Sequence, residues 1–434
     1  MNKKKILYIC DLNLVHGGAQ RITIETLPRM SKFFDIILYM SNTPTQDVLT
    51  ILNCLKIKII IDLAPTKDKL KVIVQRENIN LLLIQWENPD WILLGHEIKN
   101  QLGLNYTLFL YEVPLINTPV ITVFENWYIH SFFKLYFDLF KQFINASNKH
   151  LPNDNKILIN EVPTNMRYKK NNLLVIKKLH GLKKYFDKIK NTKKGLKGAI
   201  KLIAMGEASK YYIDRYFGFK NLILVKHCAS SDIKSVEGMF NVEVKYDLCF
   251  MAARLEPGKG IFDIVDITYR VKKILNREIK IAIVGQFINP MIKEQFNKKL
   301  KRLQLVDNVI LLGFVSESQK VETLCSSKVF IYPSKKDIFS ISLANALFCG
   351  LPAVVYDLPF VNQFKEIPIY KTKYRNIENM SKKTAELITM YEFEPSKFKE
   401  LKERIKNTFN SKFNWDKTSE EQIEAINSIL LEIG

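Results

Sequence analysis

Two cations and two glycines stand close together in the motif Arg254-Leu-Glu-Pro-Gly-Lys259-Gly260, which follows an apolar run at 248–251. Such a run predicts a strand, and the carboxyl end of a parallel strand is where open α/β sheets bind ligands. Arg254 and Lys259, five residues apart, would suit a diphosphate there. On its own, however, the motif would favour an ordinary loop with a solvated arginine and lysine. Ala253 and Gly260 stand where a P-loop needs Gly and Ser or Thr, which excludes that class of ATPase.

A carboxylate, Asp337, lies in a second motif, which spans 332–352 and reads YPSKKDIFSISLANALFCGLP. The pattern predicts a strand that ends at Pro333, a loop, and a helix that begins at about Ser340 and ends at Gly350. Asp337 and the first helical N–H groups would then face the same cleft as the two cations of the first motif. Carboxylates accept hydrogen bonds from sugar hydroxyls, and free N–H groups bind phosphate. The simpler alternative is that Asp337 caps the helix.

A glycine pair, Gly17-Gly18, follows the opening apolar run in LNLVHGGAQRITIETL. Two glycines allow a sharp turn and a close approach of the backbone to a ligand, and the N-terminus of a following helix offers N–H groups to an anion. An ordinary turn between a strand and a helix explains the pair equally well. No G-x-G-x-x-G occurs here, so the sequence lacks a dinucleotide-binding fingerprint.

The elements that must hold these motifs alternate along the chain. Short apolar, β-branched runs are separated by longer amphipathic stretches over 6–225 and again over 248–356, which is typical of βαβ units with parallel strands covered on both faces. We therefore predict an α/β fold with two doubly wound, Rossmann-like domains that face each other across a ligand-binding cleft. The predicted N-terminal domain spans 1–230 and the C-terminal domain 231–412, and a helix over 413–434 is expected to cross back to the first domain.

The composition is that of an ordinary globular protein with a strong positive charge. The 434 residues are 25% charged and 47% apolar and carry a net charge of +21. At roughly 100–200 residues per domain, two or three domains are expected. The start, MNKKKILYIC, has too few apolar residues for a signal peptide and predicts a first strand, and no apolar run predicts a membrane span. Six scattered cysteines without a C-x-x-C predict core thiols in a reducing, cytoplasmic compartment.

One segment, about 124–201, breaks the alternation and is predicted to be an insertion in the first domain. Nine of the twenty residues over 124–143 are aromatic, and twelve lysines stand against one acid over 169–201. The lysines flank an apolar stripe at helical spacing, and ammonium groups and aromatic rings favour the headgroup region of an anionic membrane. The expected membrane-docking residues come from both parts of the segment: Trp127, Phe132, Phe133, Lys177, Lys178, Lys183 and Lys184. The alternatives are that the aromatic residues pack inside the domain and that the lysines reflect a biased genome.

The order of the motifs resembles that of the retaining glycosyltransferases of family 4, which have the two-domain fold called GT-B. The similarity lies in HGGAQR, MAARLEPGKG, IAIVGQ, VILLGFVSESQ, the Asp337 motif and FNWDK, and it spans nearly the whole chain apart from the insertion. The resemblance implies a hexosyltransferase that moves a sugar from a nucleotide sugar, UDP- or GDP-linked, to an acceptor and keeps the anomeric configuration. It also implies that the donor binds mainly to the C-terminal domain and the acceptor to the N-terminal domain.

The resemblance also implies roles for single residues. By position, Arg254 and Lys259 would hold the donor diphosphate, helped by the backbone around Gly18. Asp337 falls at the first acid of the family's E-x7-E pattern, which contacts the transferred sugar. The residues expected to bind the donor, with Gly313 and Phe314 near the base, are Gly17, Gly18, Gly285, Gly313, Phe314, Phe339, Ser340, Ile341, Ser342 and Asn345.

The sequence departs from the family pattern at several positions. Asn345 replaces the second acid of E-x7-E and could bind the ribose hydroxyls only without charge. Asp337 is one methylene shorter than the usual Glu, and Ser340 stands where the family has Gly. A histidine often lies in the acceptor cleft of the family; Tyr111 takes that place here, next to Glu112, and we expect both to take part in catalysis. A catalytically inactive, membrane-associated relative is therefore the alternative function.

The expected chemistry needs no metal. No D-x-D motif occurs, which argues against the metal-dependent, single-domain sugar transferases, and we expect no cofactor. The leaving diphosphate would be stabilised by fixed cations and by helix N–H groups of the loop 339–342. The expected acceptor is a lipid-linked or membrane-associated glycan, met at the cytoplasmic face of an anionic membrane. A single-stranded nucleic-acid-binding protein, suggested by the basic charge alone, is the less favoured alternative function. No nucleic-acid partner is expected, because no RRM, KH, zinc or helix-turn-helix pattern accompanies the charge.

Overall fold

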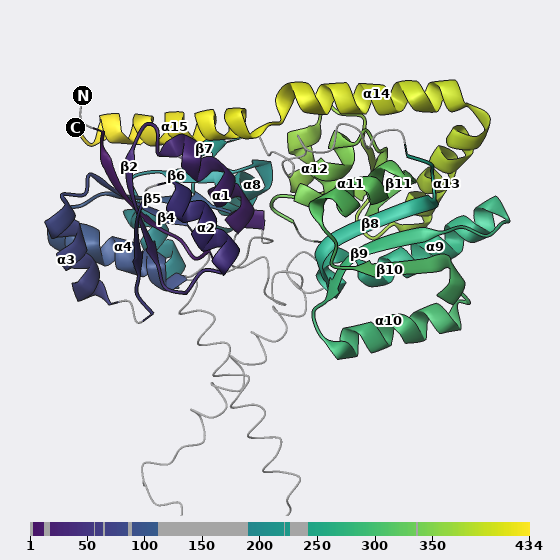
Figure 1. Ribbon diagram of the computed structural model, residues 1–434, viewed down its shortest axis with the longest axis horizontal. Helices are drawn as coiled ribbons and strands as arrows, with labels where there is room; N and C mark the ends of the chain where they lie inside the picture. The colour runs from purple at the N-terminus through teal and green to yellow at the C-terminus, as the bar shows by residue number, and fades with distance from the viewer. Residues whose placement is uncertain are drawn as a thin grey trace, which may run out of the picture. The chain divides into compact units, whose positions relative to one another are not determined.

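The computed structural model of the 434-residue chain describes residues 3–12, 18–55, 57–63, 66–85, 89–111, 190–220, 222–225, 242–335 and 337–434. Its internal contacts divide the chain into two units, one formed by 1–112 together with 195–434 and the other by 113–194. The first unit contains both β-sheets (Figure 1). Most of the predicted insertion, including all seven predicted membrane-docking residues, lies outside the described residues. Within the described part of the chain, no helix is long and apolar enough to cross a membrane.

The first sheet has seven parallel strands in the order β3-β2-β1-β4-β5-β6-β7. In chain order they are β1 (Lys5–Ile9), β2 (Asp35–Met40), β3 (Lys58–Ile61), β4 (Leu81–Gln85), β5 (Tyr106–Leu110), β6 (Leu202–Met205) and β7 (Leu222–Val225). Strands β4 and β5 are buried along their whole length, as expected of parallel strands covered on both faces. The helices between the strands are α1 (Gly18–Met30), α2 (Gln46–Cys54), α3 (Lys67–Glu77), α4 (Pro89–Leu102) and α8 (Glu207–Phe217).

The second sheet has six parallel strands in the order β10-β9-β8-β11-β12-β13. They are β8 (Tyr246–Leu255), β9 (Ile281–Phe287), β10 (Val309–Gly313), β11 (Ser327–Tyr332), β12 (Ala353–Tyr356) and β13 (Tyr370–Thr372). The helices are α9 (Ile261–Leu275), α10 (Pro290–Arg302), α11 (Glu317–Cys325), α12 (Ile341–Phe348), α13 (Ile377–Phe393) and α14 (Pro395–Lys412). Short 3-10 turns lie at η2 (Pro257–Lys259), η3 (Val306–Asn308) and η4 (Pro359–Phe364).

The strand order of the second sheet decides where its loops meet. Strand β8 lies between β9 and β11, so the chain winds outward from β8 in one direction and from β11 in the other. The carboxyl ends of β8 and β11 are therefore neighbours at a switch point of the sheet, where open α/β sheets bind ligands. The turns that carry Lys259 and Asp337 follow these two strands. The predicted fold class, two doubly wound α/β domains, is confirmed.

Two strands and one cysteine differ from the prediction, in which the first two apolar runs of the second domain end at Met251 and Val284. Strand β8 runs on to Leu255, so Arg254 lies inside the strand and not in the loop after it. Strand β9 runs to Phe287 and thus includes Gly285. Among the described cysteines Cys54, at the end of α2, is exposed, so the prediction of a core thiol is wrong at this position.

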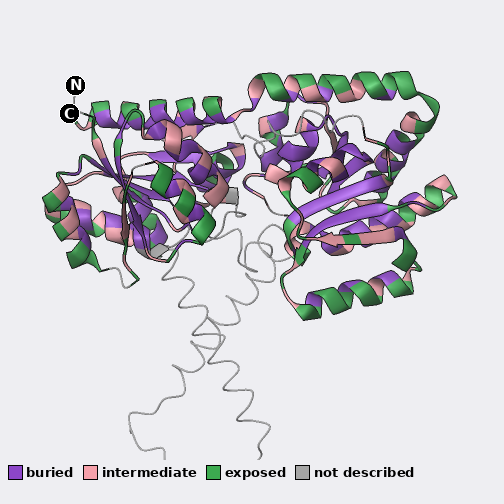
Figure 2. Ribbon diagram, viewed as in Figure 1, coloured by how far each residue is buried: buried purple, intermediate pink, exposed green. Residues whose placement is uncertain are grey.

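The last helix, α15 (Trp415–Glu432), packs on the first sheet next to α1 and β7 (Figure 1). Trp415 and Ile426 belong to the same buried cluster as the apolar residues of β1 and α1, and the buried face of α15 is turned toward this domain (Figure 2). Asn414 caps the helix, with its side chain accepting from the backbone N–H of Lys417 at 2.8 Å. The chain that completes the second sheet thus returns to the core of the first.

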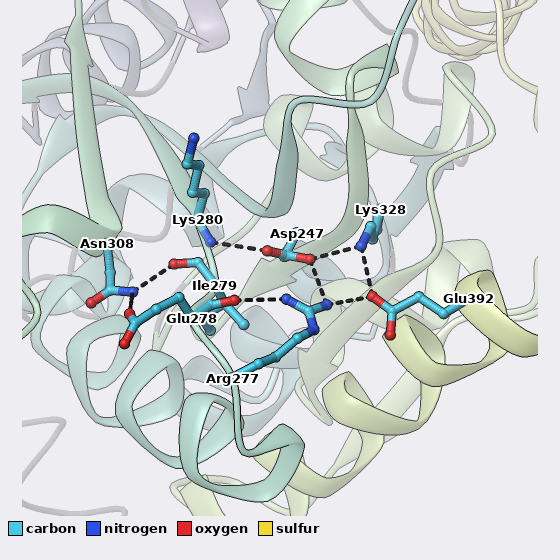
Figure 3. Close-up of polar contacts among 8 residues, drawn as sticks. All are labelled: Asp247, Arg277, Glu278, Ile279, Lys280, Asn308, Lys328 and Glu392. Atoms are coloured by element: carbon cyan, nitrogen blue, oxygen red, sulfur yellow. Dashed lines mark hydrogen bonds and ion pairs between the residues drawn. The ribbon is translucent and has the colours of Figure 1, made fainter.

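An ion-pair network connects the amino ends of β8 and β11 to α13 (Figure 3). Asp247 accepts hydrogen bonds from the side chains of Arg277 at 2.9 Å and of Lys328 at 2.8 Å. The backbone N–H of Lys280 donates to its other oxygen at 3.0 Å. Both cations also contact Glu392 near the end of α13. Burial raises the pKa of the Asp247 carboxyl, but these donors outweigh burial and hold that pKa below its usual range.

We predict that Asp247→Asn lowers the free energy of unfolding by roughly 3 kcal/mol at neutral pH, because the largely buried Lys328 and the partly buried Arg277 lose their buried carboxylate partner. The matched control is Glu392→Gln: the Glu392 side chain is 28% exposed against 11% for Asp247, so its loss should cost under about 1 kcal/mol.

The pH dependence of this stability follows from the lowered pKa. The folded-state pKa of Asp247 lies below the unfolded value, so its contribution is full at neutral pH and is lost as the pH falls through the folded-state pKa. Thermal unfolding at pH 7 and below about pH 4 measures both effects. Equal stability of the two variants at pH 7 would contradict the prediction.

Candidate functional site

The turn after β8 and the turn after β11 pack directly against each other. The backbone N–H of Lys335 donates to the carbonyl of Gly258 at 2.9 Å. A Cβ atom at Gly260 would lie only 2.1 Å from the carbonyl oxygen of Pro333. Gly260 also has a φ of +80°, a left-handed conformation that side chains disfavour. The glycine of the first motif is therefore what allows the second motif to lie against it.

A bulge near the end of β8 sets the position of Arg254. The pairing of β8 with β9 shifts register between Met251 and Arg254. Gly285 on β9 lies opposite this bulge, and a Cβ atom there would lie 1.8 Å from the carbonyl oxygen of Ala252. Because only a glycine fits, Gly285 shapes the strand that carries Arg254. Arg254 itself is exposed beside Gln286, and no ion pair is recorded for it within the described ranges.

Lys259 and Asp337, from the two turns, form an ion pair. Lys259 Nζ lies 2.9 Å from Asp337 Oδ2, and the two side chains are 21% and 8% exposed. The hydroxyl of Tyr332 donates to the same oxygen at 2.6 Å. Burial lowers the pKa of the Lys259 ammonium, but the negative charge of Asp337 outweighs burial and raises that pKa above its usual value. Lys259 therefore stays charged at any physiological pH.

Tyr332 is a member of the site to which no role could be assigned from the sequence pattern. It is the last residue of β11 and is almost completely buried, and burial followed by the charge of Asp337 raises the pKa of its phenol. A neutral hydroxyl can thus hold Asp337 Oδ2 permanently. The signal in the sequence is a polar group at the end of an otherwise apolar strand, KVFIY, directly before Pro333.

Helix α12 begins at Ile341, four residues after Asp337. Ser340 is the N-cap, and its Oγ accepts from the backbone N–H of Leu343 at 3.2 Å. The side chain of Ser340 is thus engaged, whereas no acceptor is recorded among the described residues for the N–H groups of Ile341 and Ser342. These first amides of a helix are suited to an anion. The helix also has no acid in its first turn that would compete with one.

Three residues predicted to bind the donor lie at or near the start of α12: Phe339, Ile341 and Asn345. Phe339 and Ile341 pack against the buried cluster of the first sheet. Phe339 also lies near Gly206, at 3.6 Å from where its Cβ would be. Only the backbone of these two residues is therefore available to a phosphate. Asn345 is buried on α12, and its backbone carbonyl accepts from the backbone N–H of Cys349.

Gly313 and Phe314 lie at the end of β10, beyond β9 from the first motif. Gly313 has a φ of +69°, which turns the chain away from the strand. Phe314 is 46% exposed, and the ammonium of Lys320 lies 5.9 Å from its ring centre. An exposed ring at this edge of the sheet has a flat apolar surface on which a base could stack. Its role in base binding stays a prediction.

The residues predicted for the site in the first domain are Gly17, Gly18, Tyr111 and Glu112. Gly17 and Glu112 lie outside the described residues, and Gly18 begins α1. Tyr111 follows β5 and is buried in the core cluster, with its ring 5.8 Å from that of Phe109. Burial raises the pKa of the Tyr111 phenol. A catalytic role for Tyr111 stays a prediction, and its place in the core gives that role no support.

Clusters that could bind a metal are absent from the part of the chain that the structure describes: no three His, Cys, Asp or Glu side chains gather there. What the described residues do bring together is one ammonium group, one carboxylate, one phenol and the start of a helix. An anion with hydroxyl groups attached, such as a sugar diphosphate, matches this set in charge and hydrogen bonding.

Comparisons with known proteins point to one group of enzymes. Residues 239–408 match the family model described as "Glycosyl transferases group 1". This segment contains β8 to β13 and therefore the whole of the site described above. No curated protein sequence matches the chain at a significant level.

Solved structures of glycosyltransferases match nearly the whole chain. A glycosyltransferase from Rickettsia africae is 14% identical, with a TM-score of 0.67 and 99% of each chain covered. HepE from Anabaena, in complex with UDP and glucose, is 13% identical, with a TM-score of 0.63 and 98% of this chain and 100% of HepE covered. The lipopolysaccharide outer core galactosyltransferase WaaB, in its apo form, is 12% identical, with a TM-score of 0.60 and 98% and 99% covered. The chain shares the GT-B fold with these enzymes.

We predict that Gly260→Ala lowers the free energy of unfolding by about 3 kcal/mol or more, because the added methyl group combines a strained φ with an overlap on Pro333. Gly313→Ala is the matched control: Gly313 also has a positive φ, but nothing lies within 4 Å of an added Cβ. Strain alone should cost about 1–2 kcal/mol. Thermal unfolding measures both, and an equal loss in the two variants would show that the close approach of the turns does not matter.

Proposed function

We propose that the chain is a glycosyltransferase that moves a hexose from a nucleotide-sugar donor to an acceptor glycan and retains the anomeric configuration. The observation that carries the proposal is the meeting of Lys259, Asp337 and the N-terminus of α12 at the ends of β8 and β11. The match of residues 239–408 to the glycosyltransferase family model supports it. The HepE structure with UDP and glucose supports a nucleotide-sugar donor, and we favour UDP or GDP as its nucleotide.

In the proposed reaction, charge develops on the diphosphate as the bond to the sugar breaks. Lys259 and Arg254 would bind the diphosphate oxygens, and the N–H groups of Ile341 and Ser342 would donate to the same anion. These groups are held by strands, a turn and a helix cap, so they need not reorganise during the reaction. We propose that this fixed positive field takes the place of a metal ion.

The sugar would be bound by the Oδ1 atom of Asp337. Lys259 and Tyr332 both contact Oδ2, whereas Oδ1 has no recorded partner among the described residues. A carboxylate oxygen can accept two hydrogen bonds from sugar hydroxyls. Asn345, eight residues further on, would approach the ribose as a neutral group. Retention of configuration rests on the resemblance to family 4.

We propose that the acceptor is lipid-linked or membrane-associated and is met at the cytoplasmic face of the membrane. The support comes from the sequence, where aromatic and basic residues gather over 124–201. WaaB, whose structure resembles this chain, is a lipopolysaccharide outer core galactosyltransferase. The seven membrane-docking residues lie outside the described residues, and their role is part of this proposal.

We predict that Lys259→Ala and Arg254→Ala each abolish sugar transfer without unfolding the protein, because each removes a cation from the leaving diphosphate. The wild-type chain should be stabilised in thermal melting by one of UDP, GDP and ADP, and should transfer radiolabelled sugar from the matching donor to a lipid extract. Lys293→Ala, an exposed lysine on α10, is the control for lost charge. Full turnover by either variant would remove the assignment, and wild-type protein that binds none of the three nucleotides would contradict the proposed function.

For the membrane, we predict flotation of the chain with vesicles that contain anionic lipid, and release as the salt concentration rises. Changing Lys177, Lys178, Lys183 and Lys184 to Glu should abolish flotation, since each lysine near an anionic surface contributes about 1 kcal/mol. Vesicles of neutral lipid are the control. The proposal fails if the wild-type chain does not float with anionic vesicles at low ionic strength.

A further inference from the structure

A second ion pair joins the two turns of the site, crossed with respect to the first. Lys335, in the turn after β11, contacts Asp263 in the first turn of α9, with 2.8 Å between Nζ and Oδ1. In the first pair the turn after β8 supplies the lysine, Lys259, and the turn after β11 supplies the carboxylate, Asp337. In the second pair these contributions are reversed. The segment after β8 and the segment after β11 therefore each contribute one lysine to a carboxylate of the other.

The two pairs differ in how completely their carboxylates are engaged. Asp263 Oδ1 is bound by Lys335, and its Oδ2 accepts from the hydroxyl of Tyr356 on β12 at 2.9 Å. The Asp263 side chain is 10% exposed, and Tyr356 is fully buried. A carboxylate with both oxygens engaged in the interior has little left to offer a ligand. In Asp337, by contrast, the contacts of Lys259 and of Tyr332 both fall on Oδ2.

The Asp263 pair also affects which lysine is paired with Asp337. Lys335 is two residues from Asp337 in the sequence, so its ammonium group would compete with Lys259 for that carboxylate if Asp263 were absent. Conversely, Asp263 lies four residues beyond Lys259 and would compete for that ammonium group if Lys335 were absent. In the crossed arrangement Asp263 is paired with Lys335, so Lys259 stays paired with Asp337. Leaving one partner buried and alone is costly, so rearrangement would follow its loss.

We propose that Asp263 is a positioning residue: held by Tyr356, it fixes Lys335 and thereby keeps the turn that carries Asp337 in register with the turn that carries Lys259. Its consequence for donor binding rests on the proposed function, whereas the fixing of the turns does not. Asp263 does not touch the substrate in this proposal.

A neighbouring pair on the same helix offers a matched control. Asp266 of α9 contacts Lys299 of α10 at 2.5 Å, and its side chain is 33% exposed against 10% for Asp263. This second Asp–Lys pair has the same chemistry and the same helix but does not involve either turn. A loss of stability that any buried pair on α9 would cause can thus be separated from an effect on the site.

The fixing of the turns is tested by hydrogen exchange of the full chain without ligand. In Asp263→Asn and in Lys335→Met, the amides over 333–343 should exchange at least about tenfold faster than in the wild type, while Asp266→Asn leaves them unchanged. Exchange in this segment that is the same in the wild type and in both variants would overturn the proposal, whatever the protein binds.

The consequence for the donor is tested by calorimetric titration with whichever of UDP, GDP and ADP binds the wild type. Asp263→Asn and Lys335→Met should each weaken binding by about tenfold or more, since misplacement of binding groups by about 1 Å has effects of that order. The double variant should lose about as much as either single variant, because it also lacks the contact that fixes Lys335, and Lys335→Arg should bind nearly as the wild type does. Asp266→Asn should bind within about twofold of the wild type.

Two results would count against the positioning role, and one against the function alone. Single variants that bind as tightly as the wild type, or an equal loss in Asp266→Asn, would overturn the positioning role. Wild-type protein that binds none of the three nucleotides would instead contradict the proposed function, and the exchange measurement would still decide whether Asp263 fixes the turns.

Discussion

The site depends on one close approach between two pieces of backbone. Gly260 lies so near the carbonyl of Pro333 that no side chain could stand between them. This approach brings Lys259 within 2.9 Å of Asp337 and Lys335 within 2.8 Å of Asp263, although each pair is separated by more than seventy residues of sequence. If the turns were one side chain further apart, neither pair would form. The electrostatics of the site therefore follows from a steric property of one glycine.

The parallel sheet makes this approach possible. Neighbouring strands that point the same way deliver the loops that follow them to one edge, and the β8–β11 pairing makes these two loops adjacent. Helices then complete the site from the same edge: α9 supplies Asp263, and α12 supplies its first N–H groups. The Asp247 network holds the opposite ends of the same two strands to α13. Ion pairs between side chains thus hold both ends of the β8–β11 strand pair.

Much of this arrangement could be predicted from the sequence, because it follows from the periodicity and order of local segments. Apolar runs that alternate with amphipathic stretches predicted two doubly wound domains, and the placement of Lys259 and Asp337 after two strands predicted that they would lie together. The helix expected to begin at about Ser340 and to end at Gly350 corresponds to α12, whose N-cap is Ser340.

The remaining features could not be predicted, because they depend on which side chains meet across elements. The contacts of Tyr332 with Asp337 and of Tyr356 with Asp263 require the register of β11 and β12, which the sequence does not specify. Gly285 is needed for a bulge in the neighbouring strand, not in its own. Tyr111 occupies a position that motif order assigns to the acceptor, yet its phenol lies in the core.

The central claim, that the two turns and α12 form one diphosphate site, is tested most directly by a crystal structure of the chain with bound UDP, or with GDP or ADP if one of these binds instead. We predict the diphosphate within hydrogen-bonding distance of Lys259 Nζ and of the N–H groups of Ile341 and Ser342, with Arg254 turned toward it. A diphosphate bound elsewhere, with Lys259 still paired only to Asp337, would contradict the claim.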